Sequence, residues 1–323
     1  MKNTTLLNLE QNINLYISHK QALGNVYRHE SWLLKKIVDF LKDAEMNDLN
    51  LFAYESWCKS LQDRNPNTRW KWQQIVRNFC LYRQRTESEC FVPQYETQAK
   101  PGPYVIPVIV EPEQIAQMLD SASNLPPGKL SPLRGPVLRL ATVLLYTAGL
   151  RLSELLHLTL GDLENNSSIL RIRETKFHKT RLVPLSKSAS EELQVYLKAR
   201  NAVFPIYPDA PLLCNNKSKK LGYSRCGMQV AIRNLFDIAG VHDFQGRRPR
   251  FHDLRHSFAI QALIRWYKNG DDVQTNLPKL ALYMGHVSIE STAYYLKWVP
   301  TLRILASKRF EEHFGNIVKG GAE

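Results

Sequence analysis

Toward the C-terminal end of the chain, three short motifs carry side chains that together could attack a phosphodiester. These motifs are His252-Asp-Leu-Arg255, Gly285-His286 and the adjacent pair Tyr294-Tyr295. A tyrosine hydroxyl has a pKa of about 10, so it becomes a useful nucleophile only when a neighbour removes its proton or stabilises the phenolate. Histidine and arginine are residue types suited to those two tasks.

Two further cations lie upstream, and each fits a separate part of the same reaction. Arg151 stands three residues before Glu154, and Lys176 lies between two expected strands. Attack on a phosphodiester builds negative charge on the non-bridging oxygens, which a permanently charged, planar guanidinium can bind. The leaving deoxyribose oxygen needs a proton, which a positioned lysine or histidine can donate. Glu154 shares a helical face with Arg151, so we expect it to hold that arginine in place.

The order of residues around the histidines and tyrosines limits which of them can share a face. His252 and Arg255 are three residues apart on one expected helix and therefore lie on the same side. His256 is one residue further, so we expect it to point elsewhere and to serve the structure. Tyr294 and Tyr295 differ by about 100° around a helix, so they cannot both face the site.

No metal ion or other cofactor is expected for this chemistry. The sequence has no acidic cluster suited to magnesium and no cysteine and histidine quartet suited to zinc. The five cysteines include no Cys-x-x-Cys pair, which is typical of reduced thiols in a cytosolic protein. The N-terminal segment has no apolar run typical of a signal peptide. We therefore expect a cytoplasmic protein that associates with the nucleoid.

The elements that position these residues fall on both sides of a proline-rich segment. Five of the seventeen prolines lie between residues 93 and 112, which is typical of an extended linker. We predict a helical domain at 1–92, a linker at 93–110 and a second domain at 111–323. The fold class is mainly α with a small antiparallel β-sheet. In the second domain we expect strands over 169–173 and 180–185, and helices over 133–146, 151–158, 189–199, 225–239, 253–267, 277–284, 289–298 and 302–314.

The charge of the chain predicts a polyanionic partner. The net charge is +13 at pH 7, and the expected helix that starts near Pro66 lies in a stretch of six basic and no acidic residues, from Arg64 to Thr86. Aromatic residues alternate with these cations, so we expect a core-facing side and a side that contacts DNA phosphates. The alternative is a solvated basic face. The candidate DNA contacts are Arg69, Lys71, Arg77, Arg83, Arg85 and Lys179.

At these motifs the sequence resembles the tyrosine recombinase family, also called the phage integrase family. The family's first arginine box is matched at residues 147–155, its turn lysine at Lys176, its His-x-x-Arg box at 252–255 and its Gly-His box at 285–286. The family's nucleophile normally lies nine residues after the second histidine, which selects Tyr295 over Tyr294. The similarity covers residues 111–315, and the N-terminal part resembles the family's core-binding domain more loosely.

The resemblance implies a two-domain clamp around double-stranded DNA and strand exchange without a cofactor. Tyr295 would form a 3′-phosphotyrosyl link and free a 5′-hydroxyl that attacks the partner's link, so that four protomers exchange strands through a Holliday junction. Accessory proteins or related recombinases could join the tetramer. The expected helix at 302–314 would dock on a neighbouring protomer or on its own domain. The groups implied around the scissile phosphate are Arg151, Lys176, His252, Arg255 and His286.

Two departures from the compact Xer-like members indicate a more particular role. The segment at 265–277 is longer, and residues 296–300 replace the usual sequence after the nucleophile. Both features resemble recombinases of transposons and other mobile elements, which favours integration, excision or transposition of an element. Two alternatives remain: a type IB topoisomerase-like enzyme, and a non-catalytic, architectural DNA-binding protein. The presence of all six expected polar groups argues against a decayed site.

Overall fold

The computed structural model describes residues 2–95, 98–103, 105–173, 180–217, 221–286 and 288–298. The chain forms two compact units, Met1–Val105 and Ile106–Glu323, which we call the N-terminal unit and the C-terminal unit. The mainly α fold with a small antiparallel β-sheet is confirmed. The expected helix at 302–314 lies outside the described residues. Within the described part of the chain, no helix combines the length and apolarity needed to cross a bilayer.

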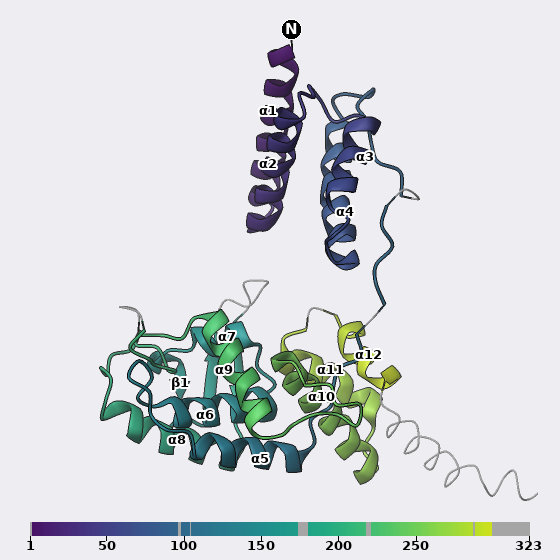
Figure 1. Ribbon diagram of the computed structural model, residues 1–323. Coiled ribbons are helices and arrows are strands. Elements are labelled where there is room, and N and C mark those ends of the chain that lie inside the picture. Colours follow the sequence, from purple (N-terminus) through teal and green to yellow (C-terminus); the bar gives the residue numbers. More distant parts are fainter. Residues whose placement is uncertain are drawn as a thin grey trace, which may run out of the picture. The chain divides into compact units, whose positions relative to one another are not determined.

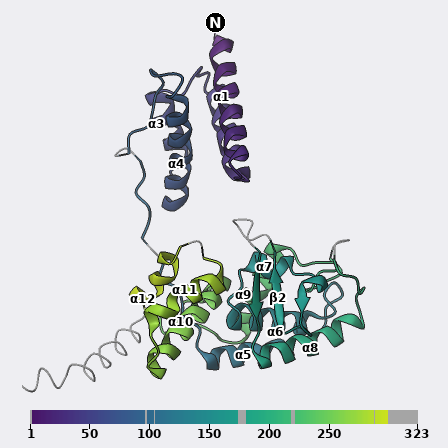
Figure 2. The same cartoon turned by 180° about the vertical axis from the view of Figure 1, so that it is seen from behind.

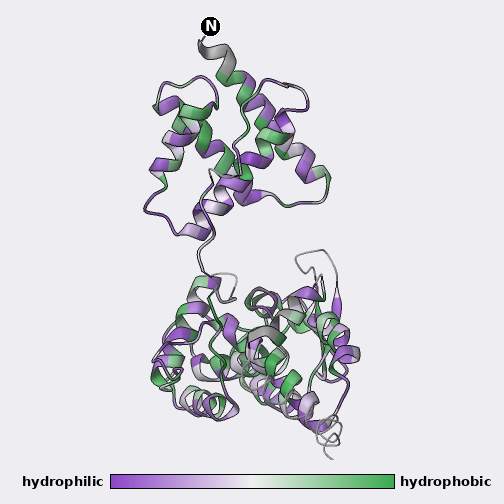
Figure 3. Cartoon of the chain, turned by 90° about the vertical axis from the view of Figure 1, so that its right-hand side faces the viewer, coloured by the Kyte–Doolittle hydropathy of each residue, from purple (hydrophilic) through white to green (hydrophobic). Residues whose placement is uncertain are grey.

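The described residues of the N-terminal unit form four helices, in a region that the sequence predicts to be helical. They are α1 (Lys2–Ala22), α2 (Arg28–Asp43), α3 (Leu51–Ser60) and α4 (Pro66–Arg83) (Figure 1). The side chain of Asn65 caps α4 and Pro66 takes its first position, where a missing backbone donor costs nothing. Hydrophobic and hydrophilic residues alternate along these helices (Figure 3). The apolar sides meet in a core that includes Leu9, Leu33 and Phe79.

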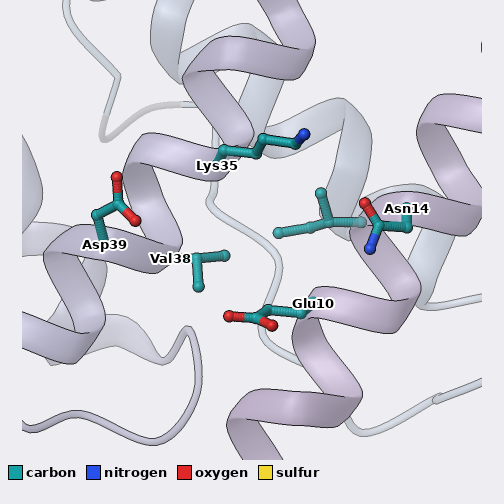
Figure 4. A pocket seen from close by; sticks show the side chains of 6 residues that line it. Glu10, Asn14, Lys35, Val38 and Asp39 are labelled. Carbon is teal, nitrogen blue, oxygen red and sulfur yellow. The ribbon is translucent and has the colours of Figure 1, made fainter.

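A pocket of about 280 Å³ opens between α1 and α2 in this unit. Glu10, Asn14, Lys35 and Asp39 place charged and polar groups around Val38 at its wall (Figure 4). Glu10 forms an ion pair with Lys42, and Lys36 pairs with Asp39 at 3.2 Å. The pocket is therefore bordered by neighbouring charges of both signs that already neutralise one another.

The C-terminal unit surrounds one strongly apolar helix. This helix, α6 (Arg134–Thr147), is buried on most of its surface and packs against helices on several sides. The other helices are α5 (Pro112–Ser123), α7 (Leu152–His157), α8 (Lys187–Asn201), α9 (Arg225–Ile238), α10 (Phe251–Asn269), α11 (Val273–Met284) and α12 (Glu290–Trp298). Helices α10, α11 and α12 contact one another and gather at one side of the unit (Figures 1 and 2).

A three-stranded antiparallel sheet lies in the same unit. A short 3₁₀ turn, η1 (Leu160–Asp162), leads into β1 (Leu163–Glu164), which pairs with β2 (Ile169–Ile172). Strand β2 then pairs with β3 (Arg181–Pro184), and this register sets Ile172 opposite Arg181. Lys176 and Lys179 fall between these two strands in the sequence and lie outside the described residues. The sheet therefore fixes where β3 begins, at Arg181.

One helix differs from the sequence prediction in a way that has a local cause. We expected a helix over 277–284, with Pro278 near its start, but α11 begins at Val273. The carboxylate of Asp272 accepts hydrogen bonds from the backbone of Gln274 and Thr275, which stabilises an earlier first turn. Pro278 therefore lies inside the helix, in its first half, where little of the backbone ladder precedes it.

Candidate functional site

Arg151 enters the site from a sharp turn after α6. Gly149 has φ of +58°, a conformation that L side chains rarely adopt, and a Cβ there would lie 2.4 Å from the ring of Phe258. Glycine at this position lets the chain reverse closely against α10 before α7 starts. Arg151 then takes the N-cap position of α7. Its guanidinium is about one quarter exposed, so part of it can still receive a ligand.

Glu154 is the centre of an ion-pair network that two arginines complete. One carboxylate oxygen accepts from Nη1 of Arg151 at 2.7 Å, and the other accepts from its backbone N–H at 2.9 Å. Arg181 binds both oxygens in a bidentate pair at 3.0 and 2.9 Å. Burial alone would raise the pKa of Glu154, but the hydrogen bonds and charge of Arg181, with those of Arg151, lower the pKa to about 2. The carboxylate is therefore ionised and positions arginines rather than donating a proton.

Arg255 is almost fully buried in α10, with 2% of its surface exposed. It donates to the carbonyl oxygens of Gly149 at 2.5 Å and Met284 at 2.6 Å, and its Nη1 lies 3.9 Å from the carboxylate of Glu154. Burial, followed by the positive charge of Arg151, lowers the pKa of Arg255 to about 10. At neutral pH the guanidinium is still charged, and it is held by backbone dipoles more than by a counter-charge.

The carboxyl end of α11 gathers three of these arginines. Arg181 donates to the carbonyl of Tyr283 at 2.9 Å, and Arg151 donates to that of Gly285 at 2.8 Å. Arg255 binds the carbonyl of Met284, which lies between them. The last carbonyls of a helix have no partner within it and carry partial negative charge, so they suit cationic donors. One helix end thus sets the positions of three guanidiniums that come from three other elements.

Gly285 makes this gathering possible. It closes α11 with φ of +67°, and a Cβ at this position would lie 2.8 Å from Nη1 of Arg181. Any larger residue would therefore force both an unfavourable backbone and a shift of the arginine. The backbone conformation and the nearby arginine therefore explain the glycine of the Gly285-His286 motif. Its histidine is a candidate for the chemistry.

Tyr295 lies on α12 and faces the interior of the C-terminal unit. Only 3% of its surface is exposed, and it packs in an apolar cluster with residues of α10 and α11. Its hydroxyl lies 3.0 Å from Nδ1 of His256, and the two rings meet edge to face. Tyr294 is also part of α12, but its side chain lies outside the described set. Tyr295 is thus the tyrosine that the described contacts join to the histidines.

Two histidines contact this tyrosine, and a third, His252, contacts one of them. His286 follows the end of α11, its Nδ1 lies 2.7 Å from Oγ1 of the buried Thr292, and its ring stacks on that of Tyr295 with centroids 6.4 Å apart. His252 meets His256 edge to face at 4.7 Å. Burial, followed by the charge of Arg255, lowers the pKa of His286 to about 4 and also lowers that of His252. The imidazoles are therefore neutral at physiological pH in the DNA-free protein.

The pKa of His256 is also lowered to about 4, first by burial and then by His252. We expected this residue to point away and serve the structure. The structure differs, because α10 packs against α12 at an angle that brings the side chain of His256 to the tyrosine hydroxyl. The spacing of residues along one helix does not reveal a contact with another helix, so the contact between His256 and Tyr295 could not be predicted from it.

The structure therefore brings five of the expected residues into one connected cluster and sets a sixth beside it. The connected residues are Arg151, Glu154, Arg255, His286 and Tyr295, with His252 adjacent through His256. Lys176 lies outside the described residues. Arg181 was not expected, because its place at the start of a strand resembles that of an ordinary surface cation. Its side chain is only 10% exposed.

The cluster carries more positive than negative charge. Arg151, Arg181 and Arg255 face one carboxylate, that of Glu154. Among the described residues, no group of histidine, cysteine, aspartate and glutamate has an arrangement that could hold a metal ion. An incoming oxyanion would complete the charge balance, and partly exposed Arg151 is where it could reach the cluster.

The expected DNA contacts on α4 and just after its end differ in accessibility. Lys71 and Arg85 are exposed, and Arg77 is half-buried with Nε bonded to the carbonyl of Pro93. Arg69 is half-buried as well. Arg83 contradicts the expectation, because it is 5% exposed and its guanidinium is bound by two carboxylates. These belong to Asp48, at 2.6 and 2.8 Å, and to Glu87, at 2.6 Å.

Comparison with known proteins places these observations in context. A sequence model of the phage integrase family matches residues 109–299. The candidate integrase/recombinase y4rE of Sinorhizobium fredii is 28% identical over 93% of this chain and 95% of its own length. The tyrosine recombinase XerC of Mannheimia succiniciproducens is 30% identical over 59% of this chain and 56% of its own. The structure of the Tn1549 transposon integrase with a circular intermediate DNA has the same fold, with a TM-score of 0.63 at 17% identity over 94% of this chain and 99% of that one.

Proposed function

The chain belongs to the phage integrase family of tyrosine recombinases, and on that premise we propose that it is a site-specific DNA recombinase with Tyr295 as its nucleophile. The observation that carries this proposal is the convergence of Arg151 and Arg255 on one helix end, in the same unit as a buried tyrosine in contact with two histidines. A family member that had lost its chemistry would have no need to hold two charged arginines in a partly desolvated network.

We propose that Arg151 and Arg255 bind the non-bridging oxygens of the scissile phosphate. Their guanidiniums are fixed before DNA arrives, by Glu154 and by backbone carbonyls, so little reorganisation is needed in the transition state. Partial burial strengthens the attraction for developing negative charge. Arg181 would act through Glu154 and Gly285, as a positioning residue that does not itself reach the phosphate.

The leaving 5′ oxygen needs a proton, and we assign its donation to Lys176. Lysine has an ordinary pKa of about 10.4 and carries its proton at neutral pH. His286, whose pKa is about 4 because of burial and the charge of Arg255, is a poor reservoir of protons at that pH. We assign His252 and His286 to hydrogen bonding at the phosphate. The ring of His286 also stacks on that of the tyrosine.

We further propose that the domain boundaries follow the proline-rich segment. A DNA-binding unit at 1–92 would use exposed cations on α4 and just after it, such as Lys71 and Arg85, to contact phosphates, with Lys179 added from the other unit. The linker at 93–110 would join it to a catalytic unit at 111–323. Double-stranded DNA is the proposed partner.

Strand exchange would follow from conservation of the bond energy in the phosphotyrosyl link. Four protomers would cleave and rejoin two duplexes in turn through a Holliday junction, without a cofactor. The full-length similarity to a candidate integrase/recombinase and the long segment at 265–277 favour integration, excision or transposition of a mobile element. Related recombinases or accessory proteins could complete the assembly.

A suicide duplex tests the function directly. The duplex carries a nick near a candidate site taken from the ends of the host element, so that cleavage releases a short fragment and traps the covalent complex. Wild type and Tyr294→Phe should give a covalent protein–DNA band on a denaturing gel, and Tyr295→Phe should give none. A band that persists in Tyr295→Phe would overturn the assignment of the nucleophile.

A synthetic Holliday junction then distinguishes recombination from the same chemistry used for another purpose. A recombinase should convert the junction into recombined duplexes. Cleavage and religation of single duplexes without junction resolution would instead identify a type IB topoisomerase-like enzyme. Binding without any covalent complex, on a substrate that a related recombinase cleaves, would indicate an architectural DNA-binding protein.

A further inference from the structure

We propose that His256 accepts the hydroxyl proton of Tyr295 during strand cleavage and returns it during religation. This role rests on the proposed function, because it assigns a partner to the nucleophile of that reaction. It adds a group that lies outside the set named by the sequence motifs.

The geometry of α10 and α12 brings the two side chains together. Nδ1 of His256 lies 3.0 Å from the tyrosine oxygen, which is hydrogen-bonding distance. The rings meet at 63° with centroids 5.4 Å apart, so the imidazole edge, where its nitrogens are, faces the phenol. Because Tyr295 is only 3% exposed, bulk water has little access to the hydroxyl, and a protein group must receive its proton.

The two neighbouring histidines are less suited to this task. His286 presents its ring face to the tyrosine ring, at 25° between planes, and its Nδ1 is engaged with Thr292. The side chain of His252 reaches solvent, although the groups packed around it desolvate the ring enough to lower its pKa, and it lies perpendicular to His256, which suits contact with an entering phosphate. His256 is the histidine whose ring nitrogen reaches the reacting oxygen.

The charges around His256 explain how DNA would activate it. From α10 and the residue before it, His252, Asp253, Arg250 and Arg255 surround the ring, and the arginines lower its pKa after the larger effect of burial. The imidazole is therefore neutral and can accept a proton at Nδ1 when Nε2 carries the ring hydrogen. A phosphodiester anion bound by the arginines would offset their charge and raise the affinity of His256 for a proton.

The reaction balances with this assignment. The hydroxyl proton of Tyr295 moves to Nδ1 of His256 as the phenol oxygen bonds to phosphorus. The bond from phosphorus to the 5′ oxygen breaks, and that oxygen takes a different proton from Lys176. In religation the 5′-hydroxyl attacks phosphorus and returns its proton to Lys176, while His256 returns its proton to the departing phenolate.

Single-turnover cleavage of two matched suicide duplexes tests this role. One duplex is ordinary, and in the other sulfur replaces the bridging 5′ oxygen, so that the leaving group is a stable thiolate that needs no proton. His256→Asn keeps a polar group near Nδ1 but cannot take up a proton. We expect it to slow cleavage by about 10²- to 10⁴-fold on both duplexes.

Lys176→Ala is the matched control, because it should be slow on the ordinary duplex and close to wild type on the sulfur duplex. Recovery of His256→Asn on the sulfur duplex would overturn the proposal, since the defect would then lie in the leaving group. Wild-type rates for His256→Asn on the ordinary duplex would also overturn it. DNA affinity and thermal unfolding of each variant, measured in parallel, identify a loss that comes from misfolding.

Chemical rescue separates proton transfer from a structural role. His256→Ala leaves space beside the tyrosine, and added imidazole should restore cleavage in proportion to its neutral form. If imidazole does not rescue His256→Ala, although this variant is folded and binds DNA, then His256 has a structural role instead. If the proposed nucleophile were wrong, the result would differ from this. Tyr295→Phe would then still form the covalent complex, although its His256 is unchanged.

Discussion

The two units of this chain differ in how each neutralises a buried arginine. In the N-terminal unit, burial raises the pKa of Tyr16, Tyr27 and Tyr54, and raises the pKa of Cys80 to about 12. These groups are neutral at pH 7, and some bond to one another, as Tyr27 does to Tyr16 at 3.1 Å. The buried cation of this unit, Arg83, is matched by two carboxylates. These buried groups are therefore either uncharged or paired with opposite charges.

The C-terminal unit instead holds cations that its own carboxylate does not fully match. Arg255 is as buried as Arg83, yet it rests on carbonyl oxygens and lies 3.9 Å from a carboxylate shared with two other arginines. Burying a charge without a full partner reduces stability. The same residue type is therefore fully neutralised in one unit, and in the other it carries positive charge that the proposed phosphate ligand would neutralise.

The largest expected effect separates two buried tyrosines. Tyr295→Phe should reduce covalent complex formation to background, because the attacking oxygen is lost. Tyr16→Phe removes a hydroxyl that is equally hidden and also hydrogen-bonded, but in the other unit. We expect it to cleave bound DNA at the wild-type rate in the suicide-duplex assay. A similar loss in both variants would mean that burial, and not chemistry, explains the effect.

The next largest effect concerns Arg255, the buried arginine of the C-terminal cluster. Arg255→Ala should lower the single-turnover cleavage rate by about 10²- to 10³-fold, because a preorganised donor to the phosphate is removed. Its DNA affinity should remain close to wild type, since most phosphate contacts lie elsewhere. A filter-binding titration beside the rate measurement checks both parts. Weaker binding with unchanged chemistry on bound DNA would contradict the assignment.

The two carboxylate centres should differ in stability when they are neutralised. Glu154→Gln leaves three guanidiniums without their shared anion and should reduce the free energy of unfolding by about 3–5 kcal/mol. Asp48→Asn should cost less, because Glu87 still neutralises Arg83. Urea unfolding of both variants, monitored by circular dichroism, gives the comparison. Equal losses would mean that the charge excess of the C-terminal unit has no energetic consequence.

Acid should distinguish the units as well. The pKa of His256 and of His286 is lowered by burial from about 6.5 to about 4, so the unfolded chain binds more protons between those values. Their contribution to stability is fully present above pH 6.5 and is lost as pH falls toward 4. Hydrogen exchange at pH 7 and pH 4.5 should show weakening in α10–α12. The tyrosines and cysteines of the other unit do not titrate in this range.

The smallest expected effect concerns two exposed cations, Lys71 on α4 and Arg85 two residues after its end. Lys71→Ala and Arg85→Ala should each reduce the slope of log affinity against log salt by about one, if each cation contacts one phosphate. Lys59→Ala, an exposed cation on α3, is the control and should leave the slope unchanged. A slope that none of the three changes would place α4 away from the DNA backbone.

How far the sequence could predict this site depended on the range of the interactions. Helical spacing was enough to pair Arg151 with Glu154, because both belong to one short segment. Arg181 and His256 could not be found in that way, since their contacts are with residues far away in the sequence. Arg83 was misassigned only partly for the same reason: Asp48 is 35 residues earlier, but Glu87, four residues later, was a local signal for an ion pair.

The end of α11 also determines when the site can form during synthesis of the chain. Its carbonyls bind Arg151 across 134 residues and Arg181 across 102 residues, and Gly149 binds Arg255 across 106. Contacts over such separations form slowly, and on the ribosome they must wait until the later partner has emerged. The earlier arginines therefore reach their final positions only after Gly285 is made, ten residues before Tyr295. The arginine cluster and Tyr295 are therefore completed within ten residues of each other as the chain is made.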